Sequence, residues 1–163
     1  MENNQQKSTM EMSGKDNSYK KLSIMLVLSF ISMYSVMFLN VDEFNHIYLS
    51  LNRTYMALLM ALPMAVVMIL LMGKMYPNKK WNTAIIFSAI ILFGLVLAGL
   101  RTQTPIGDVQ YMKGMIPHHS SAIMTSKHAN IKDPEVKKLS EEIIKSQEEE
   151  IAQMKNILKR MKK

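Results

Sequence analysis

The stretch DVQYMKGMIPHHSSAIMTSKHA at residues 108–129 holds three of the chain's four histidines and opens a charged C-terminal tail. We predict that it forms one helix, which Pro117 bends near the histidines. A second helix is predicted at 134–162, because Asp133 suits an N-cap and Pro134 suits the first helical position. The link between the helices is short, so they should form an antiparallel hairpin.

The second predicted helix has an apolar face with spacings of three and four residues, as an amphipathic helix requires. Its members are Val136, Leu139, Ile143, Ile151, Met154, Leu158 and Met161. Two helices cannot cover each other's apolar faces fully, whereas two hairpins can do so in a four-helix bundle. We therefore predict that the tail, residues 105–162, self-associates as a homodimer or a higher homo-oligomer.

The chain that precedes the tail is apolar. Three uncharged stretches are each close to the length that crosses a hydrocarbon core of about 30 Å, and they lie at 22–39, 54–72 and 82–100. We predict three transmembrane helices within residues 20–100. The polar leader at 1–19 has almost no aliphatic residues and should be disordered.

Lysines are distributed unevenly over the short polar segments between these stretches. The leader has Lys7, Lys15, Lys20 and Lys21, and the second loop has Lys74, Lys79 and Lys80. The first loop has Asp42 and Glu43, with Arg53 as its cation. Because segments rich in lysine stay in the cytoplasm, we predict a cytoplasmic N-terminus and an extracytoplasmic tail, in an integral membrane protein of the cell envelope.

Composition excludes several classes of function. The 163 residues carry a net charge of +7, but the lysines are scattered and no aromatic residues are interleaved with them, so we expect no nucleic-acid binding. The chain has no cysteine, so it has neither a disulfide nor a thiolate metal site. We find no Gly-rich phosphate loop and no nucleophilic Ser–His–Asp arrangement, and we do not expect an enzyme.

The tail concentrates soft metal ligands. The candidate ligands are Met112, Met115, His118 and His119 on the first helix and Glu150 and Met154 on the second. Imidazole with thioether favours a copper ion, Cu(I) before Cu(II), over magnesium, calcium or zinc. The alternative is that the histidines are ordinary polar residues and that Glu150 is solvated at the edge of the apolar face.

A methionine stripe also runs along the second predicted span. Its members recur every four residues, at Met56, Met60, Met64, Met68 and Met72. Methionine is an adaptable packing residue, so the stripe is explained by helix packing. A thioether path for a cuprous ion is the alternative, and the sequence leaves this open.

The tail resembles domain of unknown function family 305 in two stretches. The first is Asp108-x-x-Tyr111-x-x-x-Met115-Ile116-Pro117-His118-His119-x-x-Ala122-Ile123, and the second runs from Asp133-Pro134-Glu135-Val136 through Leu139, Ile143, Ile144 and Gln147 to Glu150-Ile151-x-Gln153-Met154. The resemblance implies a ferritin-like helical bundle, and some members are periplasmic proteins that bind copper through Met and His. It implicates Met115, His118, His119 and Met154, with Gln147 and Glu150 nearby and with Met112, Met124 and His128 as further candidates.

The leading hypothesis is a membrane-anchored, extracytoplasmic copper-binding protein that serves metal sequestration, tolerance or delivery. One alternative is a membrane-tethered assembly module that needs no metal. A ferritin-like metal oxidase is a further alternative, but it would require a carboxylate-rich dinuclear centre with Glu-x-x-His motifs, and the first tail helix has no glutamate.

Overall fold

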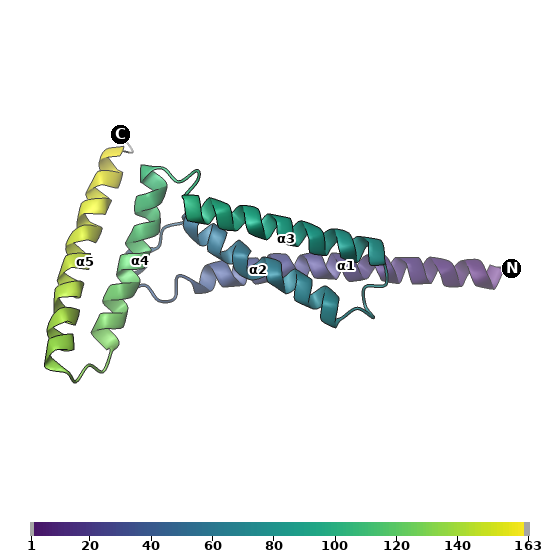
Figure 1. Ribbon diagram of the computed structural model, residues 1–163, viewed down its shortest axis with the longest axis horizontal. Helices are drawn as coiled ribbons and strands as arrows, with labels where there is room; N and C mark the ends of the chain where they lie inside the picture. The colour runs from purple at the N-terminus through teal and green to yellow at the C-terminus, as the bar shows by residue number, and fades with distance from the viewer. Residues whose placement is uncertain (1, 162–163) are drawn as a thin grey trace. The chain divides into compact units, whose positions relative to one another are not determined.

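The chain is built from helices. A computed structural model describes residues 2–161, with side chains from residue 17 onward, and Figure 1 shows its elements. They are α1 (Glu2–Val36), the 3₁₀ helix η1 (Phe44–His46), α2 (Leu51–Leu71), α3 (Lys79–Thr102), α4 (Asp108–His128) and α5 (Pro134–Met161). No strand occurs between residues 2 and 161, so the predicted all-α class is confirmed. Residue 1 of the predicted leader and residue 162 of the predicted last helix lie outside the described residues.

Three helices are long and apolar enough to cross a membrane, as the sequence predicts. These segments are Asn17–Val36, Leu51–Leu71 and Lys79–Thr102. At most about a fifth of any of them is buried inside the protein, with 22% in the second as the largest share. Apolar side chains that are exposed over such lengths need an apolar surrounding, which a lipid bilayer supplies.

The N-terminal leader differs from the prediction. It was expected to be disordered over 1–19, but α1 begins at Glu2 and continues into the first apolar segment. A helix that is already formed adds each further residue without a new nucleation step. The leader also contains good helix formers, including glutamate, glutamine, lysine and methionine, so the helix of the span can extend through it.

The chain divides into two compact units. Unit 1 takes α1 up to Met33, together with Tyr55–Thr102. Its buried cluster is Leu22, Ile69 and Tyr76, with Tyr19, Leu26, Met68, Ile85 and Ile86 packed around it. The Tyr19 hydroxyl donates a hydrogen bond of 2.8 Å to Oδ1 of Asn82 in α3. These contacts join α1, α2 and α3 at one end of the unit.

The methionine stripe of α2 lies beside the face that packs inside unit 1. The buried residues of α2 are Ala57, Ala61, Ala65 and Ile69, and each follows a methionine directly in the sequence. Met68 packs against the buried cluster, whereas Met56, Met60, Met64 and Met72 are between 37% and 48% exposed. Small residues bring helices close together, so alanine makes the contact within unit 1 and most of the stripe faces outward.

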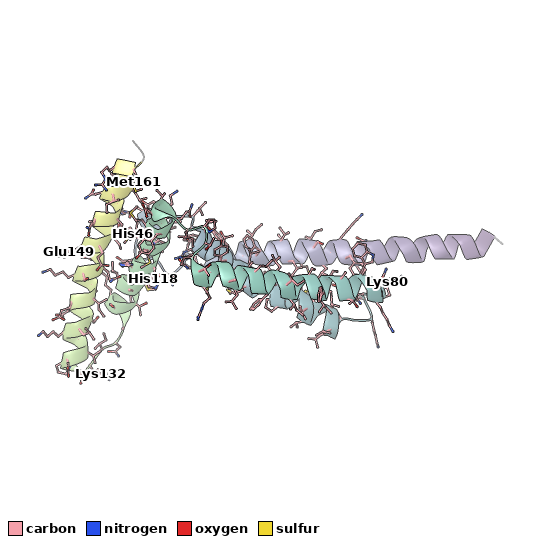
Figure 2. All side chains as sticks on the ribbon, turned by 45° about the horizontal axis from the view of Figure 1, so that its top comes forward. His46, Lys80, His118, Lys132, Glu149 and Met161 are labelled. Carbon is pink, nitrogen blue, oxygen red and sulfur yellow. The ribbon has the colours of Figure 1, made fainter. Side chains whose placement is uncertain are left out.

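Unit 2 contains the tail hairpin together with residues 34–54. Helices α4 and α5 run antiparallel, with Lys132 in their turn and Met161 at the far end of α5 (Figures 1 and 2). The predicted N-cap is confirmed, because Oδ1 of Asp133 accepts hydrogen bonds from the backbone N–H groups of Glu135 and Val136. The hairpin core is Met112, Ile116, Ile123, Ile151 and Leu158.

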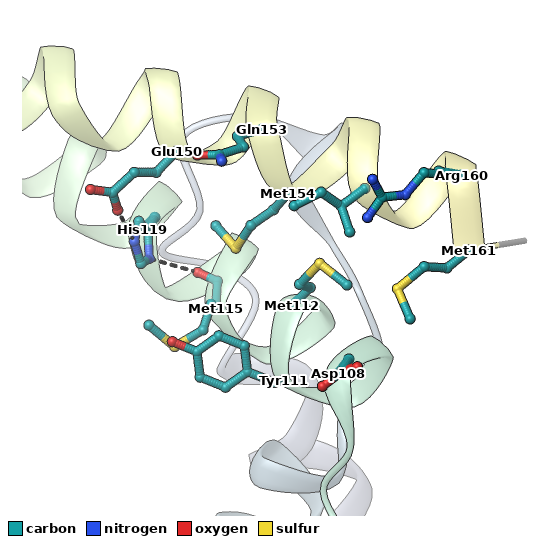
Figure 3. A pocket seen from close by; sticks show the side chains of 11 residues that line it. Asp108, Tyr111, Met112, Met115, His119, Glu150, Gln153, Met154, Arg160 and Met161 are labelled. Carbon is teal, nitrogen blue, oxygen red and sulfur yellow. Dashed lines mark hydrogen bonds and ion pairs between the residues drawn. The ribbon is translucent and has the colours of Figure 1, made fainter.

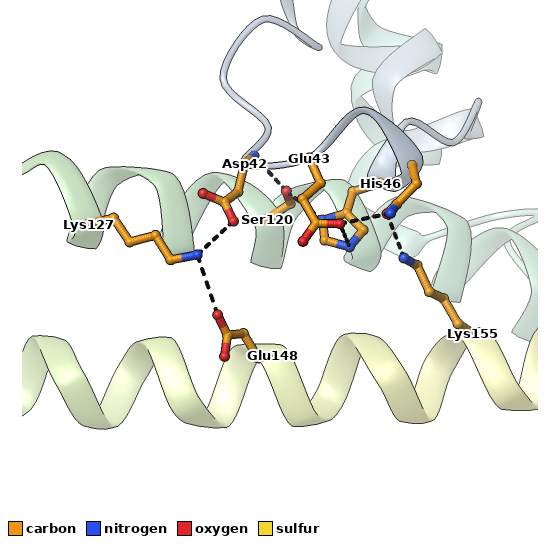
Figure 4. A network of polar contacts seen from close by, with 8 residues as sticks. Asp42, Glu43, His46, Ser120, Lys127, Glu148 and Lys155 are labelled. Carbon is orange, nitrogen blue, oxygen red and sulfur yellow. Dashed lines mark hydrogen bonds and ion pairs between the residues drawn. The ribbon is translucent and has the colours of Figure 1, made fainter.

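The segment between α1 and α2, residues 37–50, packs against α4, and we call it the docking loop. Its anchor is Ser120, which is fully buried on α4. The Ser120 hydroxyl oxygen accepts a 2.8 Å hydrogen bond from the backbone N–H of Asp42 and lies 2.9 Å from Nδ1 of His46 (Figure 4). His46 is itself only 6% exposed. One small hydroxyl therefore satisfies two polar groups of the loop.

Two lysines extend this attachment (Figure 4). Lys127 of α4 lies 2.9 Å from Asp42 of the loop and 3.4 Å from Glu148 of α5. The hydrogen bond to Asp42 raises the pKa of Lys127, and the neighbouring Glu148 adds to the effect. Lys155 of α5 donates a 2.6 Å hydrogen bond to the side-chain oxygen of Asn45. The docking loop is thus connected to both helices of the hairpin.

We predict that acidification loosens the docking loop through His46. Burial, followed by the charge of Lys155, lowers the pKa of His46 below its usual 6.5. A lowered pKa in the folded state favours the neutral ring, so its contribution is fully present above pH 6.5 and is lost as the pH falls through the lower value. Hydrogen exchange of residues 37–50, corrected for the intrinsic pH dependence, should show less protection at pH 5 than at pH 7.5.

The comparison variant is His46→Gln, which cannot titrate in this range. Its loop exchange should no longer show this pH dependence, whereas His128→Gln, at an exposed histidine, should behave as the wild type does. If His46→Gln and the wild type lose protection in parallel on acidification, then His46 is not the group that controls the loop.

Candidate metal centre

A pocket of about 640 Å³ lies between α4 and α5 (Figure 3). Its wall on α4 consists of Asp108, Tyr111, Met112, Met115 and His119. Its wall on α5 consists of Glu150, Gln153, Met154, Ile157, Arg160 and Met161. Five of the six predicted ligands therefore line one pocket, and His118 is the exception.

The helical repeat explains why these side chains meet. The lining residues of α4 follow one another mostly at intervals of three and four, and those of α5 mostly at intervals of three. Residues three or four apart share one face of a helix. Because the hairpin is antiparallel, His119 at the middle of α4 lies opposite Glu150, while Met112 lies nearer the C-terminal end of α5.

His119 is the best-defined group of the pocket. The residue is 8% exposed, and its ring nitrogens have different partners. Nδ1 lies 3.0 Å from the backbone oxygen of Met115, and Nε2 lies 2.6 Å from Oε2 of Glu150. A carbonyl oxygen can only accept a hydrogen bond, so Nδ1 carries a proton and donates it. Nε2 is then the nitrogen that can bind a metal.

Glu150 completes this contact from α5. Its side chain is 48% exposed, and the hydroxyl of Ser146 donates a further hydrogen bond to it at 3.1 Å. The hydrogen bond with His119, followed by that with Ser146, lowers the pKa of Glu150. The carboxylate form of Glu150 is therefore favoured. A metal ion at Nε2 of His119 would have to take the place of this contact with Glu150.

Methionine sulfur supplies most of the remaining donors. In Figure 3 the side chains of Met112, Met154 and Met161 point into the space between the two helices. Met115 lines the same pocket one turn before His119. Four thioethers line the pocket together with one imidazole and two carboxylates, and a lining this rich in sulfur fits Cu(I) better than it fits a hard cation.

The sequence did not single out Met161 as a ligand. It belongs to the apolar face of α5 and follows Met154 by seven residues, which is close to two helical turns. That interval was the signal that could have assigned it to the pocket. Tyr111, which is 52% exposed, and Asp108 also line the pocket, and both belong to the motif on which the family resemblance rests.

His118 does not line this pocket. Its side chain is exposed, although its ring centroid is 6.0 Å from that of His119. Consecutive helical residues project about 100° apart, so both histidines cannot face α5. Three further candidates from the resemblance, Met124, His128 and Gln147, are also absent from the lining.

The pocket lacks the ligand set of a site built from histidine and carboxylate alone. Among the described side chains, no group of three or more His, Cys, Asp or Glu residues is arranged to hold a metal ion. Any metal bound here would need methionine sulfur in its coordination shell. Zinc gains little from thioether ligands, so the residues present fit a cuprous ion best.

Comparison with known proteins gives the family. The model of the family described as "Domain of unknown function (DUF305)" matches residues 96–163. The chain is also similar to "Uncharacterized protein L153" of Acanthamoeba polyphaga mimivirus, with 41% identity over 138 residues, which cover 83% of this chain and 89% of the relative. No solved structure matches the chain.

The chain therefore belongs to the DUF305 family. The 138 aligned residues of the viral relative are more than residues 96–163 contain. The similarity must therefore extend into the apolar helices that precede the hairpin.

Proposed function

We propose that this chain is a membrane-anchored, extracytoplasmic copper-binding protein that holds Cu(I) between α4 and α5 for sequestration, tolerance or delivery. The observation that carries the proposal is a single pocket whose lining combines the imidazole of His119 with four methionine side chains. Nδ1 is fixed by the Met115 carbonyl group, so the imidazole is oriented before a metal arrives.

The pocket also suits transfer of an ion. Tyr111 and Met161 are 52% and 44% exposed, and the Glu150 side chain is 48% exposed, so one side of the pocket is open to solvent. Copper at Nε2 of His119 would take the place of the contact between this nitrogen and Glu150. An open site in which a side-chain contact can give way to a metal supports delivery as well as storage.

The metal oxidase alternative receives less support. A dinuclear oxidase centre needs several carboxylates and histidines that converge. The described side chains include no such group of three or more, and Glu150 is the carboxylate that contacts His119. The geometry therefore favours a binding protein over an oxidase.

We expect copper affinity to depend on His119 and not on its neighbour. His119→Ala in the full-length protein should weaken Cu(I) binding by on the order of tenfold or more, which is the size of loss that follows removal of even an outer-shell partner. His118→Ala is the matched control, because its side chain is exposed and outside the pocket. Competition with a chromophoric Cu(I) chelator measures both affinities.

The same titration tests the thioethers and the proton. Met154→Leu should weaken Cu(I) binding and leave zinc binding nearly unchanged, whereas Met124→Leu, outside the pocket, should change neither. Wild-type affinity should fall as the pH is lowered, because protons compete for Nε2. Equal Cu(I) affinity in wild type, His119→Ala and Met154→Leu would remove this pocket as the copper site and favour the assembly module.

A ferritin-like four-helix bundle is the assembly that we propose for unit 2. The apolar residues at the start of α5 remain open within one copy, with Val136 at 49%, Leu139 at 55% and Ile143 at 36% exposure. These residues continue the face of α5 that packs against α4. The apolar face of a second hairpin is equally long and equally apolar, so it could cover them. This supports a homodimer or a higher homo-oligomer.

Association should therefore weaken when this face becomes polar. Leu139→Ser with Ile143→Ser should shift the full-length protein in detergent toward the monomer in sedimentation equilibrium. Lys137→Ser with Glu141→Ser, at the same spacing on the exposed polar side, should leave the distribution unchanged. A wild-type protein that is monomeric at micromolar concentration would contradict the paired bundle.

The proposed topology can be tested with single cysteines, since the chain has none of its own. Lys132→Cys, in the turn of the hairpin, should react with a membrane-impermeant maleimide on intact cells. Lys79→Cys, at the lysine-rich start of α3, should react only after the cells are opened. The reverse pattern of labelling would place the hairpin, and with it the copper site, in the cytoplasm.

A further inference from the structure

A second pocket of unit 2, of about 360 Å³, is lined by three lysines. Lys113 comes from α4, and Lys155 and Lys159 come from α5. The rest of the lining is Leu158 of the hairpin core, with Asn45 and Tyr48 of the docking loop. No carboxylate contributes to the lining, so three positive charges share one concave surface.

These lysines also lack acidic neighbours along their own helices. Helical side chains interact with residues three and four positions away, and at those positions none of the three lysines has an aspartate or a glutamate. Lys155 and Lys159 are four residues apart, which places like charges together at a cost to helix stability. By contrast, Lys138 and Lys145 on the same helix each have glutamates at these distances.

The part of the chain that the structure describes gives none of the three lysines a direct ion pair. Among the described residues, the lysine ion pairs of unit 2 involve Lys127 and Lys138. Lys155 bonds to the neutral side-chain oxygen of Asn45, and it also borders a neighbouring pocket whose lining includes Asp42, Glu43 and Glu148. These carboxylates lie outside the lining of the lysine pocket, where a bound anion would offset the repulsion between the three ammonium groups.

We propose that Lys113, Lys155 and Lys159 form a binding site for a phosphate group. Lysine binds phosphate as a compact point charge, and the anionic oxygens of a phosphate group can accept hydrogen bonds from several ammonium groups at once. The Tyr48 hydroxyl is a further possible donor on the lining. The volume is within the range of small-molecule sites.

Two sources could supply the phosphate group. One is the headgroup of an anionic phospholipid. Tyr48 lies three residues before α2, which begins at Leu51 and is long and apolar enough to cross a membrane. Tyrosine is a common residue at membrane–water interfaces. The other source is soluble inorganic phosphate. The site has the same chemistry in both cases, and the probes of the experiment separate them.

The experiment compares lipid and phosphate binding by the full-length protein in nonionic detergent. Native mass spectrometry measures binding of phosphatidylglycerol against phosphatidylcholine, and calorimetry measures binding of inorganic phosphate. Lys113→Gln with Lys159→Gln should weaken binding of the preferred probe by about 30-fold. This is the loss of affinity expected when two lysines near an anionic surface lose their charge. The matched control, Lys138→Gln with Lys145→Gln, removes the same charge from outside the pocket and should change it by less than about threefold.

Each outcome decides between the sources or against the site. A preference for phosphatidylglycerol that the pocket variant loses assigns the site to a lipid headgroup, whereas phosphate binding without lipid preference assigns it to the soluble anion. Lys113→Arg with Lys159→Arg keeps the charge and should keep binding, which separates lost charge from lost folding. Binding of neither probe, or equal losses in the pocket variant and the control, overturns the proposal.

Discussion

Two consecutive side chains of α4 organise unit 2. His119 faces α5, where Nε2 lies 2.6 Å from Glu150, and Ser120 faces the docking loop, where its hydroxyl bonds to Asp42 and His46. Adjacent residues of a helix project about 100° apart, so one turn of backbone attaches two different segments. Both residues are buried, and their polar groups are satisfied by these contacts. The position of α4 between the loop and α5 follows from this pair.

This arrangement connects the candidate metal pocket to the helix that enters the apolar region. Ser120 binds the loop that leads directly into α2, and His119 is the next residue along α4. His119, which contacts Glu150, is therefore directly bonded along the chain to Ser120, which anchors the docking loop. Contacts within unit 2 thus lead from Glu150 through His119 and Ser120 to the docking loop.

Two pockets of unit 2 differ in their chemistry. The pocket with His119 contains sulfur, imidazole and carboxylate together with the guanidinium of Arg160, whereas the pocket with Lys113 contains ammonium groups without acids. Ile151 and Leu158 of the hairpin core are buried on α5. The hairpin can thus present a soft, metal-compatible surface and a cationic surface without placing the lysines among the metal donors.

The sequence alone determined the local elements. Uncharged stretches of membrane-crossing length gave the three long apolar helices, and Asp133 with Pro134 marked the start of α5, because these signals depend only on nearby residues. It also placed the candidate ligands other than His118 on one face of each helix, since helical periodicity is local. It failed for the leader, whose polar composition predicted disorder although α1 begins at Glu2. Composition does not show whether a neighbouring helix will extend.

Only the tertiary structure decided which faces meet. In the structure His119 contacts Glu150, His118 is exposed, and Met161 lines the pocket. On α2 the alanines are buried, whereas most of the methionines are partly exposed. It also paired Ser120 with a loop more than seventy residues away in the sequence. Periodicity fixes the face on which a side chain lies, but what covers that face depends on how distant segments pack together.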